Sequence, residues 1–392
     1  MLSESIRKRS VELTDDMVSI RRKIHANPEL SFQEHKTAAF IGEILDQWGI
    51  AHESVAGTGV TGVIKGKAEG RYLVLRADID ALPVTEKNNC EYRSVHPGVM
   101  HACGHDVHTA CLLGAIKLIS ERAGDFRGTL RFLFQPGEEV LPGGAVRVLE
   151  SGLLDQPEPD YVLAQHVYPE LPSGYFGFRA GPYMASTDEV FIDVIGTGGH
   201  AALQKGLVDP VLIASHLIVG LREAISRKIP ADVPVVLAFG KFDGPGTTNV
   251  IPPMVKLEGT FRILDEKWRS VAHEEIRKTV KSIASSMGAE AICRIVNGNP
   301  SLTNDIRLTN KLIGYAREFA GTEHVTDLPL RMTGEDFARY AQRFPSVFYR
   351  LGTGSQKHTH PVHHPEFDVD ESSITHGMGM MAWLSLQLLN QD

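Results

Sequence analysis

The chain has 392 residues, of which 42% are hydrophobic and 22% are charged, and this composition is typical of a globular protein with a buried core. A formal net charge of -8 argues against a nucleic-acid binder, because such proteins normally present a basic surface. The longest apolar runs are far shorter than the roughly 18 residues that a membrane span requires. The four cysteines have no disulfide-framework spacing, and the charged N-terminus lacks the apolar segment of a signal peptide. We therefore expect a cytoplasmic protein with reduced thiols that binds neither membranes nor nucleic acid.

The first part of the chain alternates strands with helices. A charged amphipathic helix is predicted over residues 1–25, and buried strands are predicted within residues 71–80, 128–139 and 160–167. A helix with apolar residues at helical spacing begins at about Asp106 and separates the first two of these strands. Strands that alternate with helices predict an α/β fold with a mainly parallel sheet that helices cover on both faces.

From about residue 185 the pattern changes to the order β-α-β-β-α-β, which is the split arrangement of ferredoxin-like domains. We predict an inserted α+β domain at residues 185–297, within a main domain made of residues 1–184 and 298–392. After the insertion the predicted elements are helices at 308–321 and 334–344, a strand at 346–352, a loop at 358–371 and a final helix.

Candidate metal ligands follow the three early strands. Asp78 and Asp80 come at the end of the first, Glu138 and Glu139 follow the second, and the third runs into His166. Open α/β sheets bind their ligands at the carboxyl ends of their strands, so these side chains can converge on one crevice.

Cys103 and His105 are two positions apart in a stretch that precedes the helix, where a loop would let both face one point. Thiolate and imidazole are good ligands for zinc and similar ions, although a cysteine is more often a small buried hydrophobic residue. Adjacent Glu138 and Glu139 point different ways, so one can hold a metal while the other takes a proton from water. The histidines at 358, 360, 363 and 364 could complete such a site.

Other catalytic classes fit the sequence less well. It has no Gly-x-Ser-x-Gly elbow for a serine nucleophile and no Cys-x-x-Cys redox motif. A cysteine nucleophile at Cys103 leaves the two glutamates unexplained, and a structural zinc site needs four closed protein ligands without a carboxylate poised beside them. The residues alone favour a metal-dependent hydrolase.

Ten motifs occur in one order between residues 25 and 371: "HANPELSFQEHKTAAFI", "LRADIDALPV", "GVMHACGHDVHTACLLGAI", "FLFQPGEE", "AQHVYP", "GTGGHAA", "TTNVIP", "GTFR", "GEDFARY" and "HHPEFDVDE". Together they resemble the amidohydrolase branch of the M20 metallopeptidases. That branch includes hippurate hydrolases, N-acyl-amino-acid amidohydrolases, indole-acetyl-amino-acid hydrolases and N-acetyldiaminopimelate deacetylases. The resemblance implies a catalytic α/β domain of metallopeptidase type with an inserted lid that usually forms a homodimer interface.

The resemblance also implies that a pair of divalent metal ions is held by Cys103, His105, Glu139, His166 and His363. The metal is expected to be zinc, manganese, cobalt or nickel. His363 fits the family position better than His364, because the family pattern is His, any residue, Pro. The thiolate of Cys103 favours zinc, cobalt or nickel, whereas the carboxylates favour manganese.

Further roles follow from the same resemblance. Glu138 is expected to be the general base and Asp80 the supporting aspartate, while Asp78 stands where other M20 branches have a ligand histidine. In the lid, His200 resembles the histidine that reaches the partner subunit's site and supports the oxyanion. Asn249 and Arg262 resemble substrate contacts, and "HAALQKG" departs from the Met-Pro that many relatives carry after the alanines.

The expected activity is hydrolysis of the linear amide bond of N-acyl amino acids, which releases a carboxylic acid and a free amino acid. Alternatives within the same fold are a dipeptidase, a carboxypeptidase and an N-acetyldiaminopimelate deacetylase. A non-enzymatic protein that captures acyl amino acids is a further alternative, although binding alone needs no base at Glu138.

Overall fold

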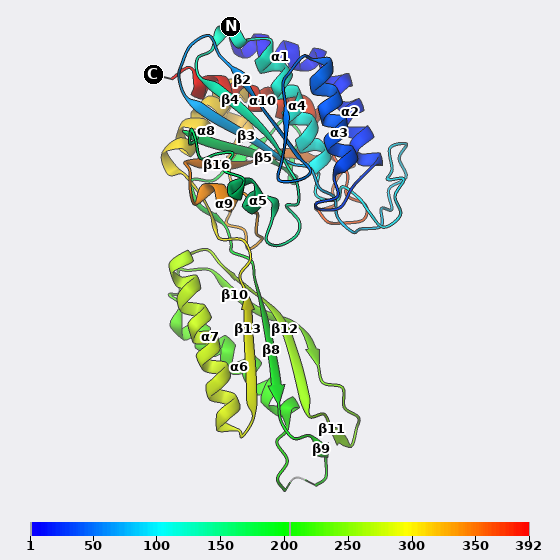
Figure 1. Cartoon of the computed structure of the whole chain (residues 1–392), viewed down its shortest axis with the longest axis vertical. Coiled ribbons are helices and arrows are strands. Elements are labelled where there is room, and N and C mark those ends of the chain that lie inside the picture. The colour runs from blue at the N-terminus through cyan, green and yellow to red at the C-terminus, as the bar shows by residue number, and fades with distance from the viewer. Residues whose placement is uncertain (1, 204, 392) are drawn as a thin grey trace. The chain divides into compact units, whose positions relative to one another are not determined.

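The computed structural model describes residues 2–203 and 205–391 (Figure 1). The chain folds into two compact units. The first consists of Met1–Gly181, Thr303–Pro329 and Asp336–Asp392, and the second of Pro182–Leu302 and Leu330–Glu335. The chain therefore leaves the first unit after Gly181, returns at Thr303, and contributes once more to the second with Leu330–Glu335.

The first unit contains an eight-stranded sheet in the order β1-β2-β4-β3-β5-β16-β6-β15. Its four central strands, β4, β3, β5 and β16, run parallel, whereas β2 and β6 join them antiparallel. All seven residues of β3 are buried, as expected for a strand that is covered on both faces. The mainly parallel sheet is confirmed. The strands are β1 (Glu53–Val55), β2 (Gly59–Lys65), β3 (Tyr72–Asp78), β4 (Thr129–Gln135), β5 (Tyr161–Pro172), β6 (Phe176–Phe178), β15 (Val325–Asp327) and β16 (Ser346–Gly354).

Helices α4 (His105–Ser120) and α10 (Ser372–Leu389) are almost entirely buried and pack against each other in the core of this unit. Gly114 of α4 allows the close approach, because a Cβ there would lie 2.5 Å from the sulfur of Met378 on α10. The other helices of the unit are α1 (Leu2–Glu12), α2 (Thr14–Ala26), α3 (His35–Gln47), α5 (Gly144–Glu150), α8 (Ile306–Ala320) and α9 (Ala338–Ala341).

Two predicted helices differ from the structure. The single N-terminal helix is divided into α1 and α2, which meet at Leu13. The helix predicted over 334–344 is wrong except for the four residues of α9. The reason is Asp336, whose buried carboxylate accepts hydrogen bonds from Gln135 and from the backbone N–H of Ala145, so this stretch is held as a loop.

The second unit has the predicted order β-α-β-β-α-β. Its four-stranded antiparallel sheet has the strand order β10-β12-β8-β13, and one face of it packs on both helices to form a separate core. Asp209 caps α6 by accepting hydrogen bonds from two backbone N–H groups, and Pro210 is its first residue. The elements are β8 (Asp188–Ile195), α6 (Pro210–Lys228), β10 (Val235–Asp243), β12 (Met254–Ile263), α7 (Glu266–Ser286) and β13 (Glu290–Val296).

Four short strands complete the fold as two separate pairs: β9 (Gly199–His200) with β11 (Val250–Ile251), and β7 (Gly181–Met184) with β14 (Leu302–Asn304). Among the described residues, no helix combines the length and the apolar character that crossing a bilayer requires.

Candidate metal and catalytic centre

Gly104, with a left-handed backbone conformation, forms a turn between Cys103 and His105. Gly104 has φ +81°, and a Cβ at this position would lie 2.6 Å from Cγ2 of Val167. Both observations require glycine here. His105 is the first residue of α4 rather than a loop residue, and Cys103 lies in the turn before it. The turn brings both side chains into one buried group with His166.

His166 approaches this turn from the sheet. Its Nε2 lies 3.5 Å from Sγ of Cys103, and its Nδ1 donates a hydrogen bond to the carbonyl of Val167 at 2.8 Å. The expectation that His166 follows its strand is wrong, because β5 continues to Pro172. The strand is longer because it keeps pairing with β16 beyond this point, as far as Pro172 opposite Gly354.

Glu139 follows β4 and connects the turn to the C-terminal loop. One oxygen, Oε1, lies 3.9 Å from Nε2 of His105 and 3.4 Å from Nε2 of His363. His363 is held by its backbone N–H, which donates to the carbonyl of Ala102 at 2.7 Å, and it has the uncommon φ of +68°.

His364 points elsewhere. Its ring stacks on that of His360 with a centroid distance of 4.3 Å, and its Nδ1 accepts a hydrogen bond from the backbone N–H of Glu366. The geometry therefore groups His363, and not His364, with Cys103 and Glu139.

Two buried atoms test whether these residues suit a metal. Nε2 of His105 and Oε1 of Glu139 have no hydrogen-bond partner among the described residues, which is rare for buried polar atoms. They face each other across 3.9 Å. Thiol, imidazole and carboxylate together form a donor set that divalent transition metals accept. The residues fit a metal centre.

The electrostatics of the site agree with this fit. Burial raises the pKa of the Cys103 thiol well above its usual range, and the Glu139 carboxylate raises it further. A thiol in such surroundings ionises only beside a strong positive charge. Burial alone would lower the pKa of His105, but the nearby Asp78 carboxylate raises it well above the ordinary value.

Asp80 contacts two of the proposed ligands. Nδ1 of His105 lies 2.8 Å from the carbonyl oxygen of Asp80 and 3.2 Å from its carboxylate, which directs Nε2 of His105 toward Glu139. The other carboxylate oxygen accepts from Ser31 Oγ at 2.6 Å and from the backbone N–H of Glu139 at 3.0 Å. Ser31 was not foreseen from the sequence.

Glu138 belongs to a group with His105 and Glu139 whose possible ligand atoms all lie within 4.8 Å of one another. Its Oε1 accepts a hydrogen bond from the backbone N–H of Asp336 at 3.3 Å. Asp336 in turn bonds Nη2 of Arg76 at 2.7 Å. Arg76 and Asp336 were missed, although Asp336 stands in the "GEDF" motif and Arg76 in "LRADID".

The three remaining predicted residues belong to the second unit. His200 and Asn249 lie together, because β9 pairs with β11 and the backbone N–H of Ala201 donates to the carbonyl of Asn249 at 2.9 Å. Both side chains are exposed. Arg262 lies on β12, half-buried, and its Nη1 is a buried atom without a hydrogen-bond partner among the described residues.

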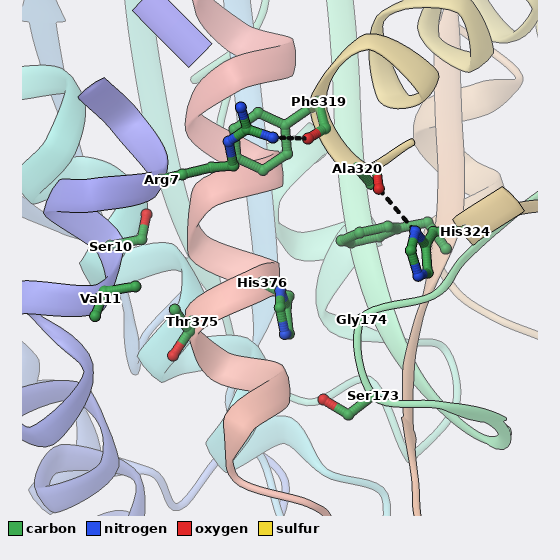
Figure 2. Close-up of a pocket in the computed structure, with 11 residues that line it drawn as sticks. Arg7, Ser10, Val11, Ser173, Gly174, Phe319, Ala320, His324, Thr375 and His376 are labelled. Carbon is green, nitrogen blue, oxygen red and sulfur yellow. Dashed lines mark hydrogen bonds between the residues drawn. The ribbon is translucent and has the colours of Figure 1, made fainter. Parts of the chain in front are cut away.

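A separate hollow of about 360 Å³ in the first unit contains none of the predicted residues (Figure 2). Figure 2 shows His376 and Thr375 on α10, Arg7 on α1, and Phe319 and Ala320 at the end of α8 around it. Arg7 donates to the carbonyl of Phe319 at 3.0 Å. Its lining includes His324 and His376 but neither a cysteine nor a carboxylate.

Known proteins resemble this chain over nearly its whole length. Residues 74–386 match the profile of Peptidase family M20/M25/M40. N-acetyl-L-cysteine deacetylase of Bacillus subtilis (strain 168) is 40% identical over 363 residues, covering 92% of this chain and 85% of that protein. Thermostable carboxypeptidase 2 of Saccharolobus solfataricus is 35% identical, with complete coverage of both chains. The crystal structure of the Bacillus subtilis YXEP protein, a dinuclear metal binding peptidase from the M20 family, superposes with a TM-score of 0.85 at 33% identity, covering 97% of this chain and 99% of that one.

These matches, together with the parallel sheet and the candidate metal-ligand groups beside it, define the class of the protein: it is an enzyme that hydrolyses amide bonds. More particularly, the chain belongs to peptidase family M20/M25/M40, and within that family it is an amidohydrolase. The non-enzymatic alternative is therefore set aside.

Proposed function

We propose that the chain hydrolyses the amide bond of N-acyl amino acids and releases a carboxylic acid and a free amino acid. The observation that carries this proposal is the place of Glu138, a carboxylate beside His105 and Glu139 in the candidate metal group. The relative named N-acetyl-L-cysteine deacetylase supports the substrate class. Two divalent ions, which are zinc, manganese, cobalt or nickel, are held in this proposal by Cys103, His105, Glu139, His166 and His363.

The residues divide the chemistry between them. Bound metals would polarise the amide carbonyl and make water more acidic. Glu138 takes a proton from the attacking water and returns it to the amine nitrogen as the amide bond breaks. Asp80 fixes the ring of His105 by accepting from its Nδ1, so that Nε2 stays directed toward Glu139.

The second unit supplies substrate contacts in this proposal. Arg262 binds the carboxylate of the amino acid, for which a buried guanidinium nitrogen without a partner is suited. His200 supports the developing oxyanion in the partner subunit of a homodimer. Asn249, which directly precedes the strand that pairs with His200, contacts the substrate. In this proposal the enzyme acts on small-molecule substrates in the cytoplasm.

A carboxypeptidase or dipeptidase activity is the second candidate, and the relative named Thermostable carboxypeptidase 2 favours it. The two activities share the same hydrolytic chemistry and differ in whether the acyl side of the bond carries an amino group or a longer peptide. An N-acetyldiaminopimelate deacetylase is a narrower form of the main proposal.

The test is release of free amine from a panel of N-acetyl, N-benzoyl and N-long-acyl amino acids and simple dipeptides. Each substrate is measured with added zinc, manganese, cobalt or nickel and again after chelation. We expect metal-dependent release from acyl amino acids. Turnover of dipeptides alone would transfer the assignment to the peptidase alternative, and release that chelation leaves unchanged would contradict the metal requirement.

A further inference from the structure

His108, one helical turn after His105 on α4, has a partner at each ring nitrogen. The residue is completely buried. Its Nδ1 is hydrogen-bonded to Oδ1 of Asp78, and its Nε2 accepts the backbone N–H of Val167 at 2.9 Å. Because Nε2 must accept, the ring carries its proton on Nδ1, where the carboxylate receives it. These two bonds hold the ring in one tautomer and one orientation.

The backbone of Val167 connects His108 to His166. Its N–H donates to His108, and the carbonyl of the same residue accepts from Nδ1 of His166 at 2.8 Å. The second bond places the proton of His166 on Nδ1 and leaves Nε2 facing Sγ of Cys103 at 3.5 Å. The two imidazoles also touch, with ring centroids 4.5 Å apart. The two bonds use the two peptide groups that flank Cα of Val167, so a bond that restrains the backbone at Val167 also restrains the direction of His166.

Asp78 is itself held in place from the other side. Its second oxygen pairs with Nη1 of Arg76, a guanidinium that is 1% exposed. The same guanidinium reaches Asp336 through Nη2 at 2.7 Å. The carboxylate that orients His108 is thus charge-compensated inside the sheet, which a buried acid needs in order to accept hydrogen bonds without a large cost.

We propose that His108 is a positioning residue for the metal centre: through the backbone of Val167 it holds His166 with Nε2 directed at Cys103. The inference rests on the proposed function, in which His166 is a ligand. Groups that orient a ligating histidine typically account for about 10–100-fold in metal affinity.

Three substitutions of His108 separate its two bonds. His108→Phe keeps a ring and removes both. His108→Gln places an amide oxygen near the position of Nε2, where it can accept from Val167, and His108→Asn places an amide nitrogen near Nδ1, where it can donate to Asp78. Zinc affinity of each purified protein is measured by competition with a chromogenic chelator. We expect His108→Phe to lose about 10–100-fold in affinity for one of two zinc equivalents, His108→Gln to recover most of it and His108→Asn to recover little.

His101→Phe is the matched control. His101 is equally buried, but neither of its ring nitrogens has a hydrogen-bond partner among the described residues, so its zinc affinity should stay unchanged. If His108→Phe fails to fold, judged by melting without metal, the order of the Gln and Asn variants decides. Wild-type affinity in all three variants, recovery by Asn instead of Gln, or an equal loss in His101→Phe would overturn the inference. Wild-type protein that binds no divalent metal would overturn the metal assignment itself, which is a distinguishable result.

Discussion

Glu138 and Glu139 are adjacent in the chain but have different surroundings. Oε1 of Glu139 lies between Nε2 of His105 and Nε2 of His363 without a hydrogen-bond donor among the described residues, as suits a ligand atom. Oε1 of Glu138 instead accepts from the backbone of Asp336, which fixes the direction of its carboxylate. The two carboxylates therefore lie in one group but have different partners.

This difference predicts that the same substitution, Glu→Gln, affects turnover at one position and metal affinity at the other. Glu138→Gln should keep metal and lose on the order of 10²–10⁴-fold in turnover, because the general base is gone. Glu139→Gln should lose metal affinity first, because a ligand is gone. Zinc affinity and steady-state amide hydrolysis, measured on both variants, check this. Near-normal turnover in metal-loaded Glu138→Gln would rule out its role.

Gly104 offers a test of the turn itself. Alanine at a φ of +81° is strained, and its Cβ would meet Val167 at 2.6 Å, so Gly104→Ala should lose roughly 1–3 kcal/mol of unfolding free energy together with metal affinity. Gly124→Ala is the matched control, because a Cβ there meets nothing within 4 Å. Urea unfolding measures the first effect and chelator competition the second. Equal stabilities of the two variants would contradict the argument.

At the scale of elements, substitution by alanine should change the unfolding free energy in opposite directions at two glycines within helices. Gly314 in α8 is exposed, and a Cβ there meets nothing within 4 Å, so Gly314→Ala should raise the unfolding free energy by about 0.5–1 kcal/mol. Gly377 in α10 faces the core, and a Cβ would lie 2.6 Å from Sγ of Cys111. Gly377→Ala should therefore destabilise by roughly 1–3 kcal/mol. Urea unfolding of both variants provides the check, and a stabilised Gly377→Ala would show that α10 can move.

The order of the elements can be predicted from the sequence, and so can the edge of the sheet at which the acids gather, because both depend on local periodicity. The exact place of His166 cannot, since the end of β5 depends on its pairing with β16, a strand near the other end of the chain. Periodicity cannot distinguish His363 from His364 as the candidate ligand either, because the direction of His363 depends on its backbone φ of +68°. Arg76 and Asp336, 260 positions apart, meet only in the folded sheet.

At the scale of the whole molecule, acid should weaken the second unit through Asp188. This buried carboxylate accepts from Arg269, from His273 at 2.8 Å and from the backbone of Gly298 at 3.0 Å. Burial alone would raise its pKa, but the hydrogen bonds from His273 and Arg269 lower the pKa to about 2. Because the pKa of Asp188 is lower in the folded state than the unfolded value of about 3.9, its ionised carboxylate stabilises the folded state by about 2 kcal/mol at pH values above about 4. This contribution is lost as pH falls from about 4 through about 2.

The measurement is urea unfolding at pH 7, 4 and 3 in a chain with Trp48→Phe and Trp383→Phe, so that Trp268 on α7 reports the second unit. Asp188→Asn in this background should be less stable at pH 7, and the difference from the parent should shrink below pH 4. A difference that stays constant down to pH 3 would mean that Asp188 does not titrate as described.

Metal removal should act on one unit only, because the proposed ligands all belong to the first. They come from four separate stretches: the turn before α4 with the first residue of that helix, the segment after β4, the middle of β5 and the loop before α10. Ions that hold these stretches together in the folded state, and cannot do so in the unfolded chain, stabilise by mass action, each by about 2.7 kcal/mol at a free concentration of 100 times its Kd. Zinc should therefore raise the melting temperature of the first unit, followed by Trp48 and Trp383, and a chelator should reverse it. Trp268 serves as the internal control, since its transition should not move. A zinc-dependent shift at Trp268, or none at the other two, would contradict the assignment of the ligands to the first unit.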